Sequence, residues 1–352
     1  MTDLTTWATW REIHAQPDIW ESFGPVVTKQ ADALRDWIAG TDASEVWFSG
    51  AGTSAYIGDF IAAALNSTTK LPLMSVATTD LVAAPSQFLG GQTPLVVSFG
   101  RSGNSTESIG VLNVLDALAP DAPRLNITCN SDGALAKRGG ANQQVIQLPD
   151  ATHDAGFAMT SSYSTMMLSA LSIFDPNRPD GAFETLAETL RKVLPAYAAL
   201  AHDMETPTRM VITGSGALRF AAREAALKVM ELTAGQIPVL WDSALGFRHG
   251  PKSFVISGTH IVCLISADPE VAKYDRDLAD ELRTQFDNIT VTEIAPTNLS
   301  DAWGAVVQVA ASQVIASVLS QRLGLNVDDP FAGRGTLTRV VSGVKLYPPA
   351  AS

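Results

Sequence analysis

Residues 94–110 read PLVVSFGRSGNSTESIG, and this stretch decides the fold. An apolar run at 95–97 passes abruptly into a polar loop that starts at Ser98, and an apolar helical repeat follows. This order predicts a strand, a loop and a helix. The hydroxyls of Ser102 and Ser105 would then lie with backbone N–H groups at a helix N-terminus, where an anion such as phosphate is favoured. The plainer alternative is that these hydroxyls only cap the helix.

The same alternation of strand and helix recurs along the whole chain. Strands are predicted at 46–48, 73–77, 95–97, 124–128 and 144–148, and again at 209–212, 261–265 and 289–294. Such spacing is typical of parallel βαβ units. A Gly-x-Gly turn follows a strand twice, at 50–52 and at 214–216, 164 residues apart. The sequence therefore predicts an α/β fold of two tandem, doubly wound parallel-sheet domains.

Proline, glycine and tryptophan divide the chain into four predicted segments. Residues 1–40 carry four tryptophans and a helical pattern with breaks at Pro17 and Pro25. The stretch 175–181, DPNRPDG, is the strongest linker signal. We therefore place a first domain at 41–180 and a second at 181–325, and we expect the tail at 326–352 to close over the site.

Net charge, cysteine positions and the N-terminal residues indicate which binding partners and which cellular compartment fit this chain. The 352 residues carry a formal net charge of −12 and no basic stripe, which argues against a nucleic-acid partner. Both cysteines, Cys129 and Cys263, lie in apolar runs, so a disulfide framework is not expected and a reducing cytoplasm fits. The first residues lack the basic and apolar regions of a signal peptide, and we expect no membrane-spanning segment.

The loop after residue 97 has a companion in the first domain. Gly52 is followed by Thr53 and Ser54, whereas the matching turn in the second domain is followed by two apolar residues. Loops at the carboxyl ends of neighbouring parallel strands meet where such sheets bind ligands. The pair favours a phosphate site in the first domain, with Arg101 adding positive charge. A dinucleotide site is the weaker alternative, because the acidic residue that it needs comes late, at Asp80.

Candidate acid and base residues lie in the second half. Glu224, Lys228 and Glu231 are spaced to share one helical face, and His249 stands in a turn bounded by glycine and proline. The alternative is a solvated ion-pair stripe and an exposed histidine. A histidine loop so near a helix with two carboxylates favours general acid–base chemistry. His153 lies in the loop 150–157 of the first domain and is a further candidate to line the site.

Several stretches together resemble the double SIS (sugar isomerase) domain family, over about residues 40–345. Within that family the chain is similar to the AgaS-type group of tagatose-6-phosphate ketose/aldose isomerases and galactosamine-6-phosphate deaminases. The family motifs are GAGTS at 50–54, the loop at 98–105, ITCN at 127–130, the helix at 224–231 and RHGP at 248–251; the group motifs are WREI at 10–13, AMTSS at 158–162 and VDDP at 327–330.

The resemblance implies a flavodoxin-like SIS fold and an enzyme that needs no cofactor or metal. It implies a hexose or 2-amino-hexose 6-phosphate as substrate, converted to a ketose 6-phosphate, with release of ammonia from an amino sugar. The likeness also implies a homodimer or higher homo-oligomer with shared active sites. A non-catalytic sugar-phosphate-binding regulator is the alternative, which the retained Glu231 and His249 disfavour.

Site residues carry over from the family by position. The implied phosphate ligands are Thr53, Ser54, Ser102 and Ser105, with Arg101 nearby. Glu231 takes the place of the family's carboxylate base, and His249 that of its ring-opening histidine, often supplied by a neighbouring subunit. From the residue pattern itself, Lys228 and Glu224 complete the catalytic set, and further substrate contacts are expected at Gly52, Ser98 and His153. Arg339 is also expected to contact substrate, in place of a lysine used by one branch of the family.

Overall fold

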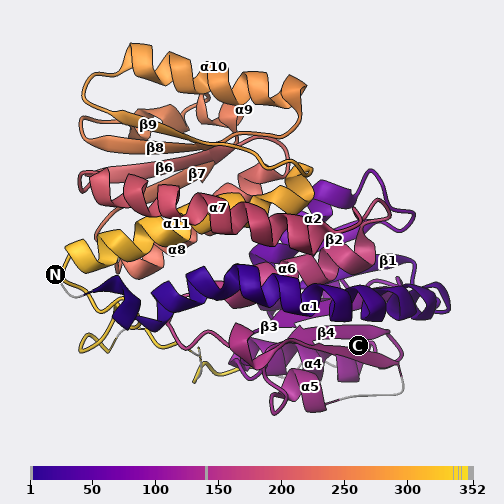
Figure 1. Ribbon diagram of the computed structural model, residues 1–352. Coiled ribbons are helices and arrows are strands. Elements are labelled where there is room, and N and C mark those ends of the chain that lie inside the picture. Colours follow the sequence, from indigo (N-terminus) through magenta and orange to yellow (C-terminus); the bar gives the residue numbers. More distant parts are fainter. Residues whose placement is uncertain (1–2, 139–141, 336, 340, 342, 348–352) are drawn as a thin grey trace. The chain divides into compact units, whose positions relative to one another are not determined.

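The computed structural model describes residues 3–138, 142–335, 337–339, 341 and 343–347, and the chain divides into two compact units (Figure 1). The first-sheet unit contains residues 21–153, 161–179 and 338–352. The second-sheet unit contains residues 1–20, 154–160 and 180–337. Each unit is built around one parallel sheet, as the alternation of strands and helices predicts.

The first-sheet unit has five parallel strands in the order β2-β1-β3-β4-β5. β3 is central and wholly buried, which explains its unbroken apolar start. The helices α2 and α6 pack on one side of this sheet, and α3, α4 and α5 on the other. The strands are β1 (Glu45–Ser49), β2 (Leu73–Ser75), β3 (Pro94–Gly100), β4 (Arg124–Thr128) and β5 (Gln143–Gln147), and the helices are α2 (Thr53–Leu65), α3 (Thr78–Ala83), α4 (Thr106–Leu118), α5 (Ala134–Lys137) and α6 (Ser161–Phe174).

The second-sheet unit has four parallel strands in the order β7-β6-β8-β9. In Figure 1, α9 and α10 cover one face of this sheet and α7, α8 and α11 the other. The strands are β6 (Arg209–Gly214), β7 (Val239–Asp242), β8 (Thr259–Leu264) and β9 (Thr290–Ile294), and the helices are α7 (Ala182–Asp203), α8 (Leu218–Leu232), α9 (Ala244–Phe247), α10 (Pro269–Gln285) and α11 (Asp301–Arg322). Short 3-10 helices lie at Leu4–Thr6, Pro85–Gln87, Asp150–Thr152 and Pro251–Phe254.

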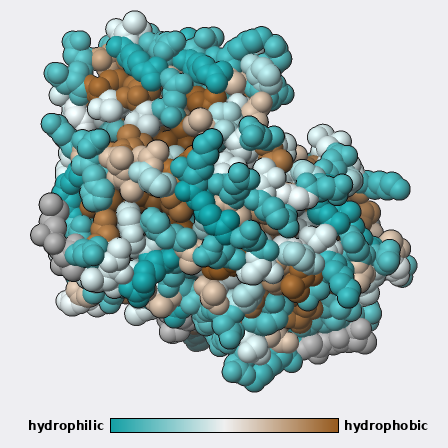
Figure 2. Space-filling model, viewed as in Figure 1, coloured by the Kyte–Doolittle hydropathy of each residue, from teal (hydrophilic) through white to brown (hydrophobic). Residues whose placement is uncertain are grey.

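Helix α11 is the core helix of its unit. Among the described residues it is the one helix long and apolar enough to cross a membrane, by length and composition alone. Within the protein, 94% of its apolar window is buried. By contrast, α10 is amphipathic, and Figure 2 shows mostly hydrophilic residues over it at the top of the view.

The structure differs from the sequence analysis at two elements, one predicted wrongly and one not predicted. The helix α1 (Ala8–Ala39) runs without interruption through Pro17 and Pro25, where breaks were predicted. An internal proline costs about 3 kcal/mol, but apolar residues such as Trp20 and Phe23 are buried along this helix and offset that cost. The edge strand β7 was not predicted, because all four of its residues are only half-buried and its pattern is weak.

Candidate active site

The two hydroxyl-bearing loops of the first-sheet unit follow neighbouring strands. β1 and β3 pair directly, with Ser49 opposite Ser98, so the turn after β1 and the loop after β3 emerge at the same sheet edge. Glycine shapes the first turn: Gly52 has a φ of 57°, and a Cβ on Gly50 would lie 2.5 Å from the backbone carbon of Ser54. The helix α2 can therefore begin immediately behind the strand.

The candidate phosphate ligands lie at two helix N-termini of this edge. Thr53 and Ser54 form the first turn of α2, and both are buried. Ser105 is the N-cap of α4, and its Oγ accepts from the backbone N–H of Ser108 at 3.1 Å. The capping interpretation is therefore confirmed for Ser105. Capping uses an oxygen lone pair, so it does not by itself prevent the hydroxyl from donating to an anion.

Arg101 brings a nearly buried guanidinium to the loop after β3, with 8% of the residue exposed. Its Nη2 donates to the backbone carbonyl of Arg339 at 3.0 Å. The backbone N–H of Thr106, at the start of α4, donates to the carbonyl of Val341. The C-terminal segment thus lies against this loop through its backbone. Arg339, predicted as a substrate contact, belongs to the same unit as the loop, and Ser98 is buried within β3 itself.

The second-sheet unit holds a buried ion-pair triad on α8. The Nζ of Lys228 lies 2.6 Å from Oε2 of Glu231 and 3.2 Å from Oε1 of Glu224. Lys228 and Glu224 are wholly buried, while the Glu231 side chain is 22% exposed. Burial lowers the pKa of Lys228, but both carboxylates raise it and prevail, so this pKa lies above its ordinary value. The ammonium therefore stays charged and holds one oxygen of Glu231, the one partly exposed carboxylate of the triad.

The alternative of a solvated ion-pair stripe on α8 is therefore wrong. The helix packs against β6, β7 and α11, which removes Glu224 and Lys228 from solvent. Both were candidates for direct catalysis, and their burial suits them instead to orient Glu231. A general base must come within hydrogen-bond reach of the proton that it removes, and the partly exposed Glu231 carboxylate is accessible for such a contact.

His249 lies in an exposed turn of the same unit, after α9. Two cations of this turn are tied to α10 through one carboxylate: Arg248 Nε lies 2.9 Å and Lys252 Nζ 2.5 Å from oxygens of Glu281. These contacts fix the turn while His249 itself is exposed. The structure places His249 and the α8 triad in one unit, and the phosphate-loop residues in the other.

His153 ends the 3-10 helix at 150–152 in the first-sheet unit and is half-buried. The residues after it belong to the second-sheet unit. Asp154 is buried and accepts from the backbone N–H and the hydroxyl of Thr160, at 2.8 and 2.9 Å. The bonds close the loop 154–160 on itself.

The group motifs at 10–13 and 327–330 lie beside the loop 154–160 where α1 begins. Asp328 caps that helix from 320 residues away, accepting from the N–H groups of Ala8 and Thr9 at 2.8 Å. Glu12 accepts from the N–H of Ala155 at 2.5 Å. The N–H of Phe157 donates to the carbonyl of Asp328 at 2.9 Å. Sequence reasoning used these motifs only as a family signal, because long-range carboxylate contacts leave no local pattern.

Glu12 has an unusual protonation equilibrium. Burial and then the nearby Asp154 raise its pKa from the ordinary 4.5 to about 7, although the N–H groups of Ala155 and Gly156 oppose the shift and Asp328 adds to it. The folded protein therefore binds this proton more tightly than the unfolded chain does. Its contribution to the free energy of unfolding falls as pH rises from 4.5 through 7.

We expect the Glu12→Gln variant to flatten this pH dependence. Glutamine keeps an oxygen for the Ala155 N–H but carries no charge to repel Asp154. At pH 8 the variant should match or exceed the wild type in stability, by roughly 1 kcal/mol after solvent screening of a partly exposed group. Urea unfolding of both proteins between pH 5 and pH 8 measures the difference. A wild type and variant with parallel pH profiles would contradict the assigned pKa.

Histidine, cysteine, aspartate and glutamate are the side chains that could ligate a metal ion in this chain. Over the part of the chain that the structure describes, no group of three such side chains is arranged to hold a metal ion.

Comparison with known proteins identifies the family. Residues 41–174 match the SIS domain model. The chain is 36% identical over 369 residues to D-galactosamine-6-phosphate deaminase AgaS of Shewanella sp. (strain ANA-3), covering 99% of this chain and 94% of that protein. It is 37% identical over 370 residues to the Escherichia coli protein of the same name, covering 97% and 96%.

A solved structure agrees with these relatives. The crystal structure of tagatose-6-phosphate ketose/aldose isomerase from Escherichia coli matches with a TM-score of 0.89 and 33% identity, over 99% of both chains. Both the sequence and the fold therefore agree over nearly the full length of the chain. This protein is an enzyme of the SIS-domain phosphosugar isomerase family and belongs to its AgaS-type group.

Proposed function

We propose that this enzyme converts a 2-amino-hexose 6-phosphate to a ketose 6-phosphate and ammonia by proton transfer between C2 and C1. Galactosamine 6-phosphate is the first choice of substrate, because relatives named for its deamination share more than a third of their residues with this chain. The observation that carries the chemistry is the partly exposed Glu231 carboxylate, held by a buried ammonium on a rigid helix. We expect the enzyme in the cytoplasm.

The phosphate is bound, in this proposal, at the carboxyl edge of the first sheet. Thr53 and Ser54 at the start of α2 and Ser102 and Ser105 before α4 supply hydroxyls, two helix N-termini supply N–H groups, and Arg101 supplies charge. The phosphate group is remote from the reacting carbons. The free energy gained when it binds offsets the entropy lost when C1 and C2 are held in the reactive orientation. Gly52, Ser98, His153 and Arg339 remain proposed substrate contacts.

The reaction uses groups of the second-sheet unit. His249 assists opening of the sugar ring to the aldehyde. Glu231 removes the proton from C2, giving an enolamine, and a proton is then added at C1 to leave an imine at C2. Water adds to that imine and ammonia leaves, which yields the ketose phosphate. Lys228 and Glu224 act as positioning residues that orient the Glu231 carboxylate.

Ser102→Ala tests the phosphate site. A hydrogen bond to a charged group contributes about 1.5 kcal/mol or more, so KM should rise about 10-fold while kcat changes little. Steady-state kinetics measure both constants. The matched control is Ser67→Ala, an exposed serine of the same unit, which should leave KM unchanged. An unchanged KM in the Ser102 variant would remove this residue from the site.

A substrate panel tests the proposed function and its alternatives. Galactosamine and glucosamine 6-phosphates distinguish the two configurations at C4, and ammonia release distinguishes deamination from simple isomerisation. Tagatose 6-phosphate tests ketose–aldose interconversion without an amino group. Tight binding across the panel with neither ammonia nor isomer formed would favour the non-catalytic regulator instead.

A homo-oligomer with shared sites stays part of the proposal. His249 lies in an exposed turn, so its side chain is accessible to a neighbouring subunit, and this exposure supports the proposal. Sedimentation of the native enzyme measures the oligomeric state. Mixed oligomers of inactive Glu231→Gln and His249→Ala chains would regain activity only if the two residues can act in one site from different chains.

A further inference from the structure

The second sheet has the strand arrangement at which open parallel sheets form a ligand crevice. In the order β7-β6-β8-β9, strands β6 and β8 are neighbours, as β1 and β3 are in the first sheet. A Gly-x-Gly turn follows β6 just as one follows β1, and Gly52 and Gly216 share a φ of 57°. In open parallel sheets this is the edge at which ligands bind.

The hydrogen-bond donors at this edge of the second sheet donate to the carboxylates of Asp275 and Asp301. Ser215, after β6, donates its hydroxyl to Oδ1 of Asp275 at 2.6 Å, and the N–H of Ser266, after β8, donates to Oδ2 at 3.0 Å. The hydroxyl of Ser266 donates to Oδ2 of Asp301 at 2.5 Å, and the N–H of Ala267 to Oδ1 at 2.7 Å. Two hydroxyls and two backbone N–H groups thus converge on anionic oxygens.

This donor set is the kind that binds a free oxyanion. Hydroxyls and backbone N–H groups at the ends of adjacent strands are suited to phosphate or carboxylate oxygens. Asp275 comes from the buried face of α10 and is only 2% exposed. Burial raises its pKa, and the bonds from Ser215 and Ser266 oppose that rise. In the first-sheet unit, residues 110–112 of α4 read Gly-Val-Leu and supply no carboxylate.

We propose that the second sheet carries a latent site for a small oxyanion, which Asp275 and Asp301 fill with the protein's own carboxylates. A consequence, which rests on the proposed function, is that one chain binds one sugar phosphate, on the first sheet. Removing the Asp275 carboxylate should open the site to a free anion of similar chemistry, such as formate or phosphate.

Anion rescue of Asp275→Ala tests the proposal. The variant leaves buried donors without their acceptor, so its unfolding temperature should fall by roughly 5 °C. Formate at about 100 mM should restore at least half of that loss, since a ligand that binds only the folded state stabilises it. Chloride at equal ionic strength should not. The wild type should show no formate-specific gain, because its site is already filled.

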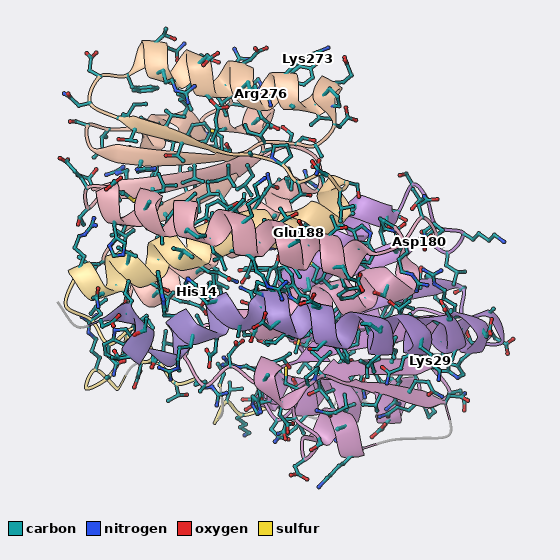
Figure 3. All side chains as sticks on the ribbon, viewed as in Figure 1. His14, Lys29, Asp180, Glu188, Lys273 and Arg276 are labelled. Atoms are coloured by element: carbon teal, nitrogen blue, oxygen red, sulfur yellow. The ribbon has the colours of Figure 1, made fainter. Side chains whose placement is uncertain are left out.

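Asp277→Ala is the matched control. Asp277 lies on the same helix but is exposed, as are Lys273 and Arg276, which Figure 3 labels on α10. Its variant should show neither the loss nor the formate response. Equal responses of Asp275→Ala to formate and chloride would overturn the proposal. If Asp275→Ala is insoluble with and without formate, Asp301→Ala removes the second carboxylate of the crevice and is judged by the same criteria.

Titration calorimetry separates this proposal from the proposed function. The Glu231→Gln enzyme, which should bind this substrate with little turnover, should bind one galactosamine 6-phosphate per chain, and two per chain would overturn the latent site. Absence of sugar-phosphate binding would count against the proposed function, while formate rescue of Asp275→Ala would still support the latent oxyanion site.

Discussion

Glu231→Gln should lower kcat by about 100- to 10,000-fold, the range typical for loss of a general base. Glutamine has nearly the same shape, so it keeps the contact to Lys228 but cannot accept the C2 proton. KM should change little, because the proposed phosphate contacts that dominate binding belong to other residues. Coupled assays of ketose phosphate and ammonia measure both constants.

The control for this variant is Glu188→Gln. Glu188 is an exposed glutamate on α7 of the same unit and is labelled in Figure 3. Its substitution should leave kcat within twofold of the wild type. Urea unfolding of both variants excludes a folding defect as the cause. A Glu231→Gln enzyme with wild-type kcat would remove Glu231 from the role of base.

Lys228→Met should destabilise the folded protein by about 3–5 kcal/mol, the cost of breaking a buried ion pair on one side. Methionine fills a similar volume, but it leaves the wholly buried Glu224 carboxylate without its counter-charge. Because the pKa of Lys228 lies above its ordinary 10.5, the stabilising charge is present throughout the neutral range and is lost only at higher pH. Urea unfolding at pH 7.5 measures the loss.

Two further variants test whether the stability lost in Lys228→Met comes from the unpaired Glu224 carboxylate. Lys273→Met removes an exposed lysine of the same unit, whose partner Glu270 is also exposed, and should cost less than 1 kcal/mol. Glu224→Gln combined with Lys228→Met removes the stranded charge and should recover part of the stability. A single Lys228→Met variant as stable as the wild type would mean that the triad is not a coupled unit.

Much of the fold could be predicted because parallel sheets leave strong local signals. The apolar start of β3, wholly buried between two helical layers, and the glycine turns after β1 and β6 both appear directly in the sequence. The loop residues Ser102 and Ser105 were assigned to a helix N-terminus from the order of residues alone. Ser105 is the N-cap of α4, as the capping alternative predicted.

Other features depend on contacts that local patterns do not encode. The prolines of α1 signal breaks, and only burial along the rest of that long helix explains why it continues. Glu224 and Glu231 look alike in sequence, yet packing of α8 buries the first and leaves the second partly exposed. The capping of α1 by Asp328 joins residues 320 positions apart.

The position of Asp275 on α10 is a sequence signal for a buried carboxylate. It lies three residues after Ala272 and three before Leu278, both buried, so it interrupts the apolar face of α10. Asp277 and Asp280 on the same helix fall on the exposed face. An acid on an apolar helical face needs donors, and here Ser215 and Ser266 supply them.

One time course tests the central claim most directly: galactosamine 6-phosphate incubated with the wild-type enzyme and followed by NMR. The proposed function predicts that substrate disappears while ammonium and a ketose 6-phosphate appear in equal amounts. Glu231→Gln, run in parallel, should form neither at a comparable rate. If the wild type binds galactosamine and glucosamine 6-phosphates but releases no ammonium and forms no ketose phosphate from either, the central claim is contradicted.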